Sequence, residues 1–400
     1  MQETIRFARV KICDLTQFYS PRSGGVRRYV HEKIAHIRRE GGHAHVLIVP
    51  GEKDAVTVGE RSTVYTIRSP LVSRTAQYRA LLRLGRVAEI LEHERPDILE
   101  SADPYQLGWT ALACGRELRI PVVAFYHSHF AEAYVSGIAS RLGGAVAGLA
   151  MDGARRYTAD LYSRFARTLV PSPALAAELR AWGVGNTTPV DLGVDTDIFC
   201  PTPDDALATR AELGIPQDCV LLLYVGRLAP EKNTRTLFSA FEMLVREQPG
   251  RFHLLAVGDG PQRDFLQTLS ETTRAVTWQE YCAEPAALAR LYRAADIFTH
   301  PGVRETFGLA ALESQACGTP VVGIRGTRLD RIIFSGLDLW AHGNTPHALA
   351  GAVEKMSRAE PAALGAQAAR EVAARFPWTV VFNRLFAVYR DVLSTYKPGC

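Results

Sequence analysis

Short apolar runs alternate with segments of helical periodicity along the whole chain. A short apolar run bounded by turn residues is typical of a strand buried on both faces, whereas an apolar residue at every third or fourth position is typical of a helix packed on one side. Strands and helices that alternate in this way build a parallel sheet with helices on both faces. The pattern therefore predicts an α/β protein with doubly wound parallel sheets.

The alternation occurs twice, so we expect two Rossmann-like domains. Strands are predicted at residues 10–13, 45–49, 97–99, 122–126 and 168–170, then at 220–225, 253–257, 275–277, 295–300 and 319–322. The clearest predicted helices are 29–40, 79–91 and 234–246, with a strongly amphipathic one over 378–393 at the end of the chain. The polar, proline-rich stretch 201–205 has the composition of a linker, which places the boundary near residue 200.

The stretch from residue 300 to 323 carries the most informative chemistry. Glu305 follows a predicted strand, and Glu313 lies on a helix predicted over 308–317. A carboxylate in such a loop accepts hydrogen bonds from sugar hydroxyls, and one on the helix can hold a diol such as a ribose. The free N–H groups at the helix start face an oxygen-rich ligand. These features predict a sugar-nucleotide pocket, whose loop residues are Thr306, Phe307, Gly308 and Leu309.

A second cluster follows the strand predicted at 220–225. Gly226 makes the turn, and Arg227 and Lys232 present two cations just ahead of a helix. Cleavage of a sugar–phosphate bond leaves negative charge on the nucleoside diphosphate, and two preorganised cations stabilise that charge. We expect this cluster to bind the diphosphate without a metal ion.

These two stretches resemble the signature of glycosyltransferase family 4. The resemblance rests on Glu305 and Glu313 with seven residues between them, on Phe307-Gly308, and on the Gly-Thr-Pro-Val-Val of 318–322. The segment 226–233 is similar to the family's Gly-Arg-Leu-x-x-x-Lys-Gly, with Asn233 in place of the last glycine. The resemblance implies a GT-B fold, with an acceptor domain (1–199 plus a crossing helix, 376–400) and a donor domain (200–375) facing a cleft.

Further site residues follow from the resemblance. Gly24 and Gly25 match the family's Gly-Gly loop, and Gly258 lies in a Gly-x-Gly-Pro loop beside the nucleotide; plain turns are the alternative for both. In Tyr-His-Ser-His, His127 is the histidine expected next to the reacting sugar, with His129 as the second choice and a buried structural histidine as the alternative. The Tyr-His-Ser-His motif also resembles that of family members with lipid acceptors, such as sulfoquinovosyl- and mannosyl-diacylglycerol synthases.

Two further segments bear on the resemblance, the first on metal binding and the second on diphosphate binding. Asp195-Thr196-Asp197 has the spacing of a manganese motif, but it follows Leu-Gly-Val at the domain junction and matches the family's Gly-Val-Asp-x-x-x-Phe, so no metal is expected. Where many members carry Gly-Gly followed by Pro-Glu, this chain has residues 326–331, Gly-Thr-Arg-Leu-Asp-Arg. Only the Gly326 amide, alone or together with that of Thr327, carries over to diphosphate binding, which leaves donor choice open.

Composition narrows the class of protein. The net charge of +4 is too small to indicate nucleic-acid binding, and seven scattered cysteines without a Cys-x-x-Cys pair predict reduced thiols rather than disulfides or zinc. No apolar run is long enough for a membrane span, so a cytoplasmic protein is expected. Arginines at 68–86 around apolar positions 81–87 suit either a solvated helix face, which we prefer, or a peripheral contact with an anionic membrane.

The predicted function is metal-independent, cofactor-free transfer of a hexose, with retention, from a nucleotide donor such as UDP-glucose or GDP-mannose to a glycan, lipid or small-molecule hydroxyl. Arg227 and Lys232 would hold the leaving diphosphate, while Glu305 and His127 orient the sugar. A nucleotide-sugar epimerase, a phosphorylase and a sugar-nucleotide-binding scaffold without turnover are the alternatives. The base, the hexose, the acceptor and the oligomeric state stay open.

Overall fold

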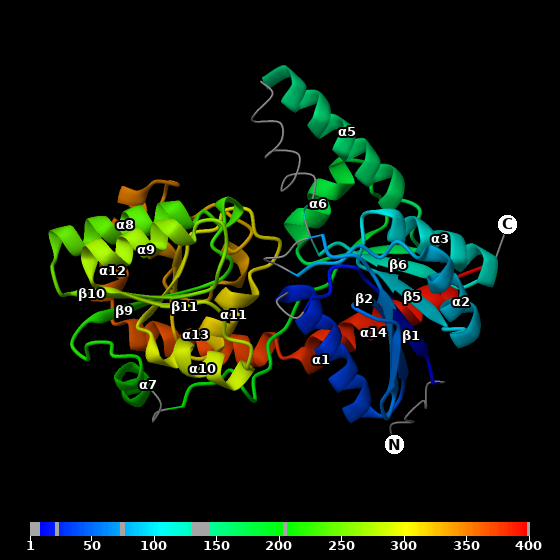
Figure 1. Cartoon of the computed structure of the whole chain (residues 1–400), viewed down its shortest axis with the longest axis horizontal. Helices are drawn as coiled ribbons and strands as arrows, with labels where there is room; N and C mark the ends of the chain where they lie inside the picture. Colours follow the sequence, from blue (N-terminus) through cyan, green and yellow to red (C-terminus); the bar gives the residue numbers. More distant parts are fainter. Residues whose placement is uncertain are drawn as a thin grey trace. The chain divides into compact units, whose positions relative to one another are not determined.

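The computed structural model describes residues 9–20, 24–72, 77–127, 129, 144–202 and 206–397 of the 400-residue chain. Its internal contacts divide the chain into an N-terminal unit, Met1–Leu192 with Trp378–Cys400, and a C-terminal unit, Gly193–Pro377. Each unit is an α/β sheet covered by helices on both faces, as the sequence predicts (Figure 1).

The N-terminal unit contains an eight-stranded sheet in the order β3-β4-β2-β1-β5-β6-β7-β8. Every pair in it is parallel except β3 with β4, which form an antiparallel hairpin at the edge. Its strands are β1 (Lys11–Leu15), β2 (Ala44–Gly51), β3 (Ala55–Val58), β4 (Ser62–Arg68), β5 (Ile98–Ser101), β6 (Val122–Phe125), β7 (Arg167–Val170) and β8 (Thr187–Pro189). Its helices are α1 (Gly25–Glu40), α2 (Leu84–Glu94), α3 (Gln106–Leu118), α5 (Gly144–Tyr162), α6 (Pro173–Ala181) and α14 (Trp378–Thr395).

The C-terminal unit contains a five-stranded, wholly parallel sheet in the order β11-β10-β9-β12-β13. Its strands are β9 (Val220–Val225), β10 (Phe252–Val257), β11 (Val276–Gln279), β12 (Ile297–His300) and β13 (Val321–Gly323). Its helices are α7 (Ala206–Glu212), η2 (Pro230–Lys232), α8 (Thr234–Glu247), α9 (Arg263–Thr273), α10 (Pro285–Ala294), α11 (Leu309–Ala316), η3 (Asp330–Ile332), η4 (Leu337–Leu339), α12 (Pro346–Arg358) and α13 (Pro361–Arg375).

Both sheets have the strand order of a dinucleotide-binding fold, in which the chain moves outward from the first strand and then returns to its other side. The order reverses between β1 and β5 in the N-terminal unit, and between β9 and β12 in the C-terminal unit. Ligands of such sheets bind beyond the carboxyl ends of the strands at this reversal. The topology therefore marks one place in each unit where functional side chains are expected.

The last helix, α14, packs beside α1 on one face of the N-terminal sheet (Figure 1). The apolar positions predicted for residues 378–393 form its buried side, where Trp378 stacks on Phe382 and Phe382 lies against Tyr29 of α1. Burying such large aromatic side chains contributes about 1.5–3 kcal/mol each. The chain thus leaves the C-terminal unit at Pro377 and ends as part of the N-terminal unit's core.

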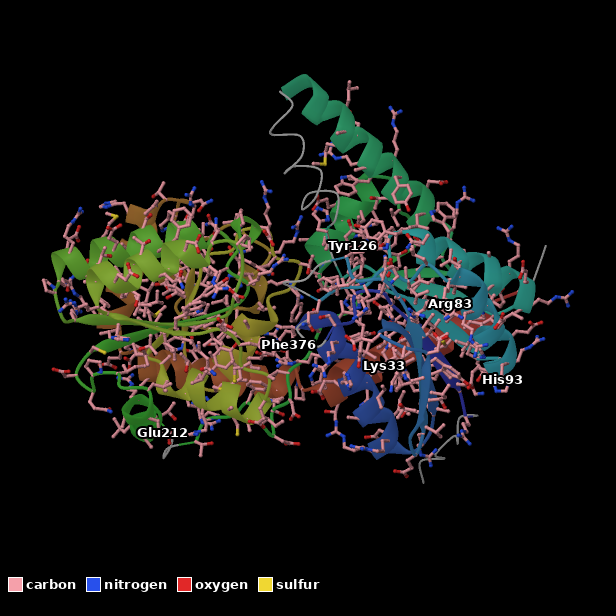
Figure 2. The ribbon with its side chains drawn as sticks, viewed as in Figure 1. Lys33, Arg83, His93, Tyr126, Glu212 and Phe376 are labelled. Carbon is pink, nitrogen blue, oxygen red and sulfur yellow. The ribbon has the colours of Figure 1, made fainter. Side chains whose placement is uncertain are left out.

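A cluster of buried charges lies under α1 and α14, centred on Lys33 (Figure 2). The Lys33 ammonium donates to Asp14 Oδ1 at 2.8 Å, to Glu100 Oε1 at 3.0 Å and to Tyr389 Oη at 3.0 Å. The Tyr29 hydroxyl also donates to Glu100, and Tyr389 donates to its other oxygen. All three donors of the lysine are therefore used inside the protein.

The helix predicted over 79–91 is wrong in its first turn, because α2 begins only at Leu84. Upstream of it, Arg79 donates to the Ser69 carbonyl at 2.9 Å and bridges to Leu71, which holds this segment against the β4 end as extended chain. Arg83 pairs with Asp54 at 2.6 Å and Arg86 with Glu89 at 2.6 Å. Arg74 lies outside the described residues. These pairs fit the solvated face that we preferred. The described part of the chain contains no helix long and apolar enough to cross a membrane.

Candidate functional site

The predicted donor residues of the C-terminal unit gather where the strand order reverses. The loop after β9 carries Arg227 and Lys232, and the loop after β12 carries Glu305. Asn233 Nδ2 joins the two loops by donating to the Pro301 carbonyl at 2.8 Å. Residues 73 positions apart in sequence therefore meet at one edge of the sheet.

Lys232 and Glu305 form the central contact, with Nζ 2.6 Å from Oε1. Their side chains are 33% and 16% exposed, so a ligand in solvent can reach both. Burial opposes ionisation of Glu305, but the charge of Lys232, helped by His300 and Arg227, outweighs it and holds the pKa of Glu305 below its usual range. The site therefore offers an ionised carboxylate beside an ammonium group.

Arg227 lies on the same loop but does not contact Glu305. Its guanidinium is half exposed and pairs with Glu231 of the next turn. The loop backbone is held by the Tyr224 hydroxyl, which donates to the Arg227 carbonyl at 2.9 Å. A bound diphosphate would have to draw the guanidinium away from Glu231, whereas Lys232 is already turned toward Glu305.

Asn233 stands where the family pattern has glycine, and the structure explains why asparagine fits there. This residue adopts the left-handed conformation (φ 57°), which glycine and asparagine tolerate better than other residues. The amide side chain also binds Asn344 Oδ1 at 2.8 Å and accepts from Thr236 at 2.8 Å. The turn expected of a Gly at this position is therefore preserved, and the asparagine adds bonds that glycine lacks.

Gly258 is required by the approach of two loops. At φ 146°, a Cβ added there would lie 1.9 Å from the Gly226 carbonyl oxygen, so no side chain fits. The Gly226 amide donates to the Val257 carbonyl at 2.9 Å, which ties the loop after β9 to the end of β10. Gly258 thus has a packing role whether or not it also borders a nucleotide.

The second predicted carboxylate, Glu313, is only 3% exposed. The Tyr292 hydroxyl of α10 donates to its Oε2 at 3.1 Å. A ribose could reach this carboxylate only after side chains around α11 rearrange. The predicted diol-binding role therefore stays a prediction, and the geometry of the free protein places Glu313 in the interior.

The loop between the two glutamates leads into α11 through Thr306, Phe307 and Gly308. Phe307 is 2% exposed, and Arg331 lies 5.2 Å from its ring centre. Gly308 caps the helix at φ 98°, where a Cβ would lie 2.1 Å from Leu329. The loop can therefore offer a ligand its backbone, together with the N–H groups of the first turn that begins at Leu309.

The segment that departs from the family after Gly323 is folded onto itself. The amides of Gly326 and Thr327 donate to the Asp330 carboxylate at 2.8 and 3.2 Å. These two amides, which the resemblance assigns to the diphosphate, are thus already bonded to a carboxylate in the free protein.

In the N-terminal unit the predicted glycines lie at the start of α1. Gly24 is the N-cap, and no described atom lies within 4 Å of a Cβ added there, so packing does not require a glycine. Gly25 is the first residue of the helix. Pro21, Arg22 and Ser23, the rest of the predicted loop, lie outside the described residues.

The two candidate histidines face different neighbours. His127 stacks on Phe125 with ring centres 4.0 Å apart and meets the edge of Tyr29 at 4.9 Å, while His129 pairs with Glu178 of α6 at 3.2 Å. Burial, reinforced by the charge of Lys33, lowers the pKa of His127 to about 3. His127 is therefore an uncharged ring at neutral pH and can contribute hydrogen bonding but no positive charge.

Sequence reasoning did not single out two titratable residues at the strand ends. Asp103, just after β5, accepts from the Gln17 amide at 2.9 Å and its side chain at 2.5 Å; burial raises the pKa of Asp103 to about 7. His300 ends β12, with Nε2 3.9 Å from Glu305 Oε1. One signal could have found both residues. Each is a polar residue at or just after the end of an apolar strand, and each of these strands lies beside the reversal of strand order.

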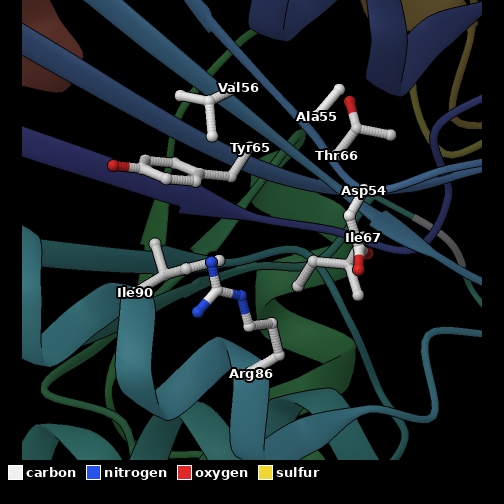
Figure 3. A pocket seen from close by; sticks show the side chains of 8 residues that line it. All are labelled: Asp54, Ala55, Val56, Tyr65, Thr66, Ile67, Arg86 and Ile90. Carbon is white, nitrogen blue, oxygen red and sulfur yellow. The ribbon is translucent and has the colours of Figure 1, made fainter.

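Two further features are the turn at Asp195–Asp197 and a hollow in the N-terminal unit. Asp195 Oδ1 accepts from the Asp197 amide at 3.0 Å within its own turn, and among the described residues no group of three or more His, Cys, Asp or Glu side chains could hold a metal ion. A hollow of about 280 Å³ lies between the β3–β4 hairpin and α2 (Figure 3) and is lined by Tyr65, Arg86 and Ile90, among others. None of the predicted site residues lines it.

Comparison with known proteins gives matches along most of the chain. Residues 23–198 match the family model described as Glycosyltransferase Family 4, and residues 205–371 match Glycosyl transferases group 1. A GDP-mannose-dependent alpha-mannosyltransferase of Mycolicibacterium smegmatis is 32% identical over 395 residues, covering 96% of this chain and 98% of the relative.

A GDP-mannose-dependent alpha-(1-6)-phosphatidylinositol dimannoside mannosyltransferase of Mycobacterium tuberculosis is 32% identical over 371 residues, 92% of this chain and 93% of the relative. Among solved structures, a sucrose-phosphate synthase from Thermosynechococcus elongatus superposes with a TM-score of 0.75 at 22% identity, covering 96% of this chain and all of that one. The sequence similarity extends over both units, and the structural similarity supports the same two-sheet fold.

Proposed function

Because the chain belongs to glycosyltransferase family 4, we propose that it transfers mannose from GDP-mannose to a hydroxyl of a glycan or glycolipid, with retention of the α configuration. The observation that carries this proposal is the pairing of Lys232 with Glu305 at the reversal of strand order. The choice of GDP-mannose rests on the two mannosyltransferases that match nearly the whole chain.

In the proposed reaction the bond between the sugar C1 and the β-phosphate oxygen breaks, and a bond from C1 to the acceptor oxygen forms on the same face. The leaving phosphate oxygen takes the proton of the acceptor hydroxyl, so no protein base is needed. Lys232 and Arg227 stabilise the charge that develops on the diphosphate. Glu305 accepts hydrogen bonds from the mannose hydroxyls through Oε2, which has no hydrogen-bond partner among the described residues.

The remaining predicted residues have narrower roles in this proposal. The backbone N–H groups at residues 307–309 and Gly258 border the nucleotide, Glu313 holds the ribose after rearrangement, and Gly24 with Gly25 leaves room for a ligand at the start of α1. His127 acts as an uncharged hydrogen-bonding group. No metal and no cofactor is part of the reaction, and a peripheral membrane contact is a property of the acceptor rather than of the donor site.

The test is titration calorimetry of the full chain with GDP-mannose, UDP-glucose and ADP-glucose in the presence of EDTA, followed by NMR of the product anomer. We expect GDP-mannose to bind most tightly, to be turned over with EDTA present and to give the α product. A preference for another nucleotide sugar, an inverted product or a requirement for added metal would contradict the corresponding part of the proposal. Binding without turnover with any acceptor would favour the scaffold alternative.

A further inference from the structure

His300 lies in the donor site without a role in the mechanism above. It is the last residue of β12, only 8% exposed, and its Nε2 is 3.9 Å from Glu305 Oε1. That distance is too long for a hydrogen bond, although it needs only a small rotation of either side chain to become one. The same oxygen, Oε1, is the one that Lys232 occupies at 2.6 Å.

The histidine ring can lie close to the carboxylate because Gly302, which lies beside both, has no side chain. A Cβ added at Gly302 would lie 3.0 Å from His300 Cε1 and 3.1 Å from Glu305 Oε1, so a larger residue would push the two apart. His300 Nδ1 is buried and makes no hydrogen bond of ordinary geometry among the described residues, although backbone groups of His300 and Gly302 lie close enough to raise the pKa of the ring. A buried polar atom without a partner is destabilising unless another group forms a hydrogen bond with it. A donor hydroxyl beside Glu305 would do so.

Binding of the sugar donor changes which groups can compensate the negative charge of Glu305. In the free protein Lys232 compensates the partly buried carboxylate, but Lys232 is also the cation that the diphosphate of the sugar donor attracts. Once the ammonium turns toward the phosphates, Glu305 needs another hydrogen-bond donor, because an uncompensated charge with little access to water is costly. His300 is the group placed to supply one.

On the basis of the function proposed above, we propose that His300 is a positioning residue that takes over Glu305 Oε1 from Lys232 when the donor binds. Its Nε2–H then donates to Oε1, which keeps Oε2 turned toward the sugar. The neutral imidazole has one N–H and one acceptor nitrogen, so Nδ1 is left to accept from a donor hydroxyl.

The electrostatics of the site agree with a neutral ring. Burial lowers the pKa of His300 and Lys232 lowers it further, and together they outweigh the opposing effects of Glu305 and of the backbone of His300 and Gly302. The other groups that face Glu305 are Arg227 on the loop after β9 and the buried Tyr224 hydroxyl of β9, whose pKa burial and Glu305 raise. Tyr224 donates to a carbonyl and Arg227 pairs with Glu231, so neither is placed to replace His300 at Oε1.

The experiment compares His300→Phe, His300→Gln and His300→Asn in the full chain, with GDP-mannose as donor. Phenylalanine removes both nitrogens, the glutamine amide nitrogen reaches the position of Nε2, and the asparagine nitrogen reaches that of Nδ1. We expect His300→Phe and His300→Asn to lower kcat roughly ten- to a hundredfold, the effect of losing a hydrogen bond to a charged group, and His300→Gln to stay within about threefold of wild type.

The pH profile separates positioning from a general structural effect. Without the His300 donor, the pKa of Glu305 rises in the donor complex, so the acid limb of kcat moves to higher pH. The acid limb of kcat/KM reports the free enzyme, where Lys232 still pairs with Glu305, and should move little. His253→Phe is the matched control, because His253 lies at the opposite end of the same sheet, bonded to Thr277 at 2.9 Å, and should change neither limb.

Three results would overturn the inference. They are an unchanged kcat and acid limb in His300→Phe, equal activity of the glutamine and asparagine variants, and parallel shifts of both limbs. If His300→Phe folds poorly, the glutamine and asparagine pair still decides, since both keep a polar amide. Wild-type protein that turns over no nucleotide sugar would instead overturn the proposed function, and this inference with it.

Discussion

Each unit contains a buried or half-buried lysine paired with a glutamate, and the two pairs differ in what the lysine has left to offer. The Lys33 and Glu100 side chains are 0% and 2% exposed, and Lys33 uses its three donors on Asp14, Glu100 and Tyr389. Lys232 and Glu305 are 33% and 16% exposed, and within the described part of the chain Lys232 uses one donor, on Glu305.

This difference separates a structural pair from a binding pair. A lysine whose donors are all satisfied inside the protein can only hold elements together, whereas one with two donors left and access to solvent can bind an anion. The same residue types in one fold thus have opposite uses, and the count of unused donors tells them apart better than the pairing itself.

Removing the structural lysine should have the largest effect. Lys33→Met leaves Glu100 buried without a cation and Asp14 with only His45, at 2.8 Å, as a basic partner, so we expect about 3–5 kcal/mol of lost stability in the N-terminal unit. Hydrogen exchange of β1 and β5, measured with urea unfolding, reports the loss. Lys11→Met is the control, because Lys11 pairs with Glu94 at 3.1 Å with 37% of its side chain exposed, and should cost about 1 kcal/mol or less. Equal stability of the two variants would contradict the structural role.

Removing the binding lysine should affect turnover rather than folding. Lys232→Met is expected to lower kcat/KM about 10²–10³-fold, as when a preorganised group that stabilises developing charge is lost, with a stability change of about 1 kcal/mol or less. Steady-state kinetics and thermal unfolding measure the two effects. Lys355→Met, at an exposed position on α12 of the same unit, should change neither. Activity of Lys232→Met close to that of the control would exclude the role in catalysis.

Asp103 extends the comparison to a buried carboxyl group whose pKa no neighbouring cation lowers. Burial raises the pKa of Asp103 from 3.8 to about 7, so between these values the folded chain holds a proton that the unfolded chain has lost. Stability should therefore fall as pH rises through this window, by at most about 1.4 kcal/mol for each pH unit. In Asp103→Asn this contribution is absent, so the stability difference between variant and wild type should change with pH.

Urea unfolding at pH 5, 6, 7 and 8 measures this difference. The control is Asp97→Asn, since the exposed Asp97 carboxylate accepts a hydrogen bond from the Lys11 amide near the same sheet. We expect the Asp97 variant to parallel wild type across the series. An Asp103 variant that also parallels wild type would mean that the carboxyl titrates as it does in the unfolded chain.

Much of the fold could be predicted because buried parallel strands are continuous apolar runs. The strand predicted at 220–225 coincides with β9, and the helix predicted at 234–246 ends one residue before α8 does. The hairpin β3–β4 and the short β8 were missed, because half-exposed strands rich in threonine show no such run. The start of α2 was misplaced because the contacts of Arg79 with β4 override the local periodicity.

The site was predictable only where spacing along the chain determines position. The spacing of Glu305 and Glu313 placed them on a loop and a helix, yet it could not show that Tyr292 buries Glu313 or that Lys232 meets Glu305. Contacts between residues far apart in sequence, such as the Lys33 cluster, leave no local pattern. His300 was missed for the same reason, since its partner lies on another element.

The place of α14 in the N-terminal core has a consequence for synthesis on the ribosome. Tyr389, which completes the bonding of Lys33 and Glu100, and Phe382, which covers Tyr29, are translated after the whole C-terminal unit. The N-terminal unit can therefore finish folding only after the C-terminal unit has been translated. Until α14 has been translated, Tyr29 is not covered by Phe382. Lys33 and Glu100 also lack their hydrogen bonds with the Tyr389 hydroxyl. We expect the nascent chain to depend on chaperones during that interval, and truncation before residue 378 to leave it insoluble.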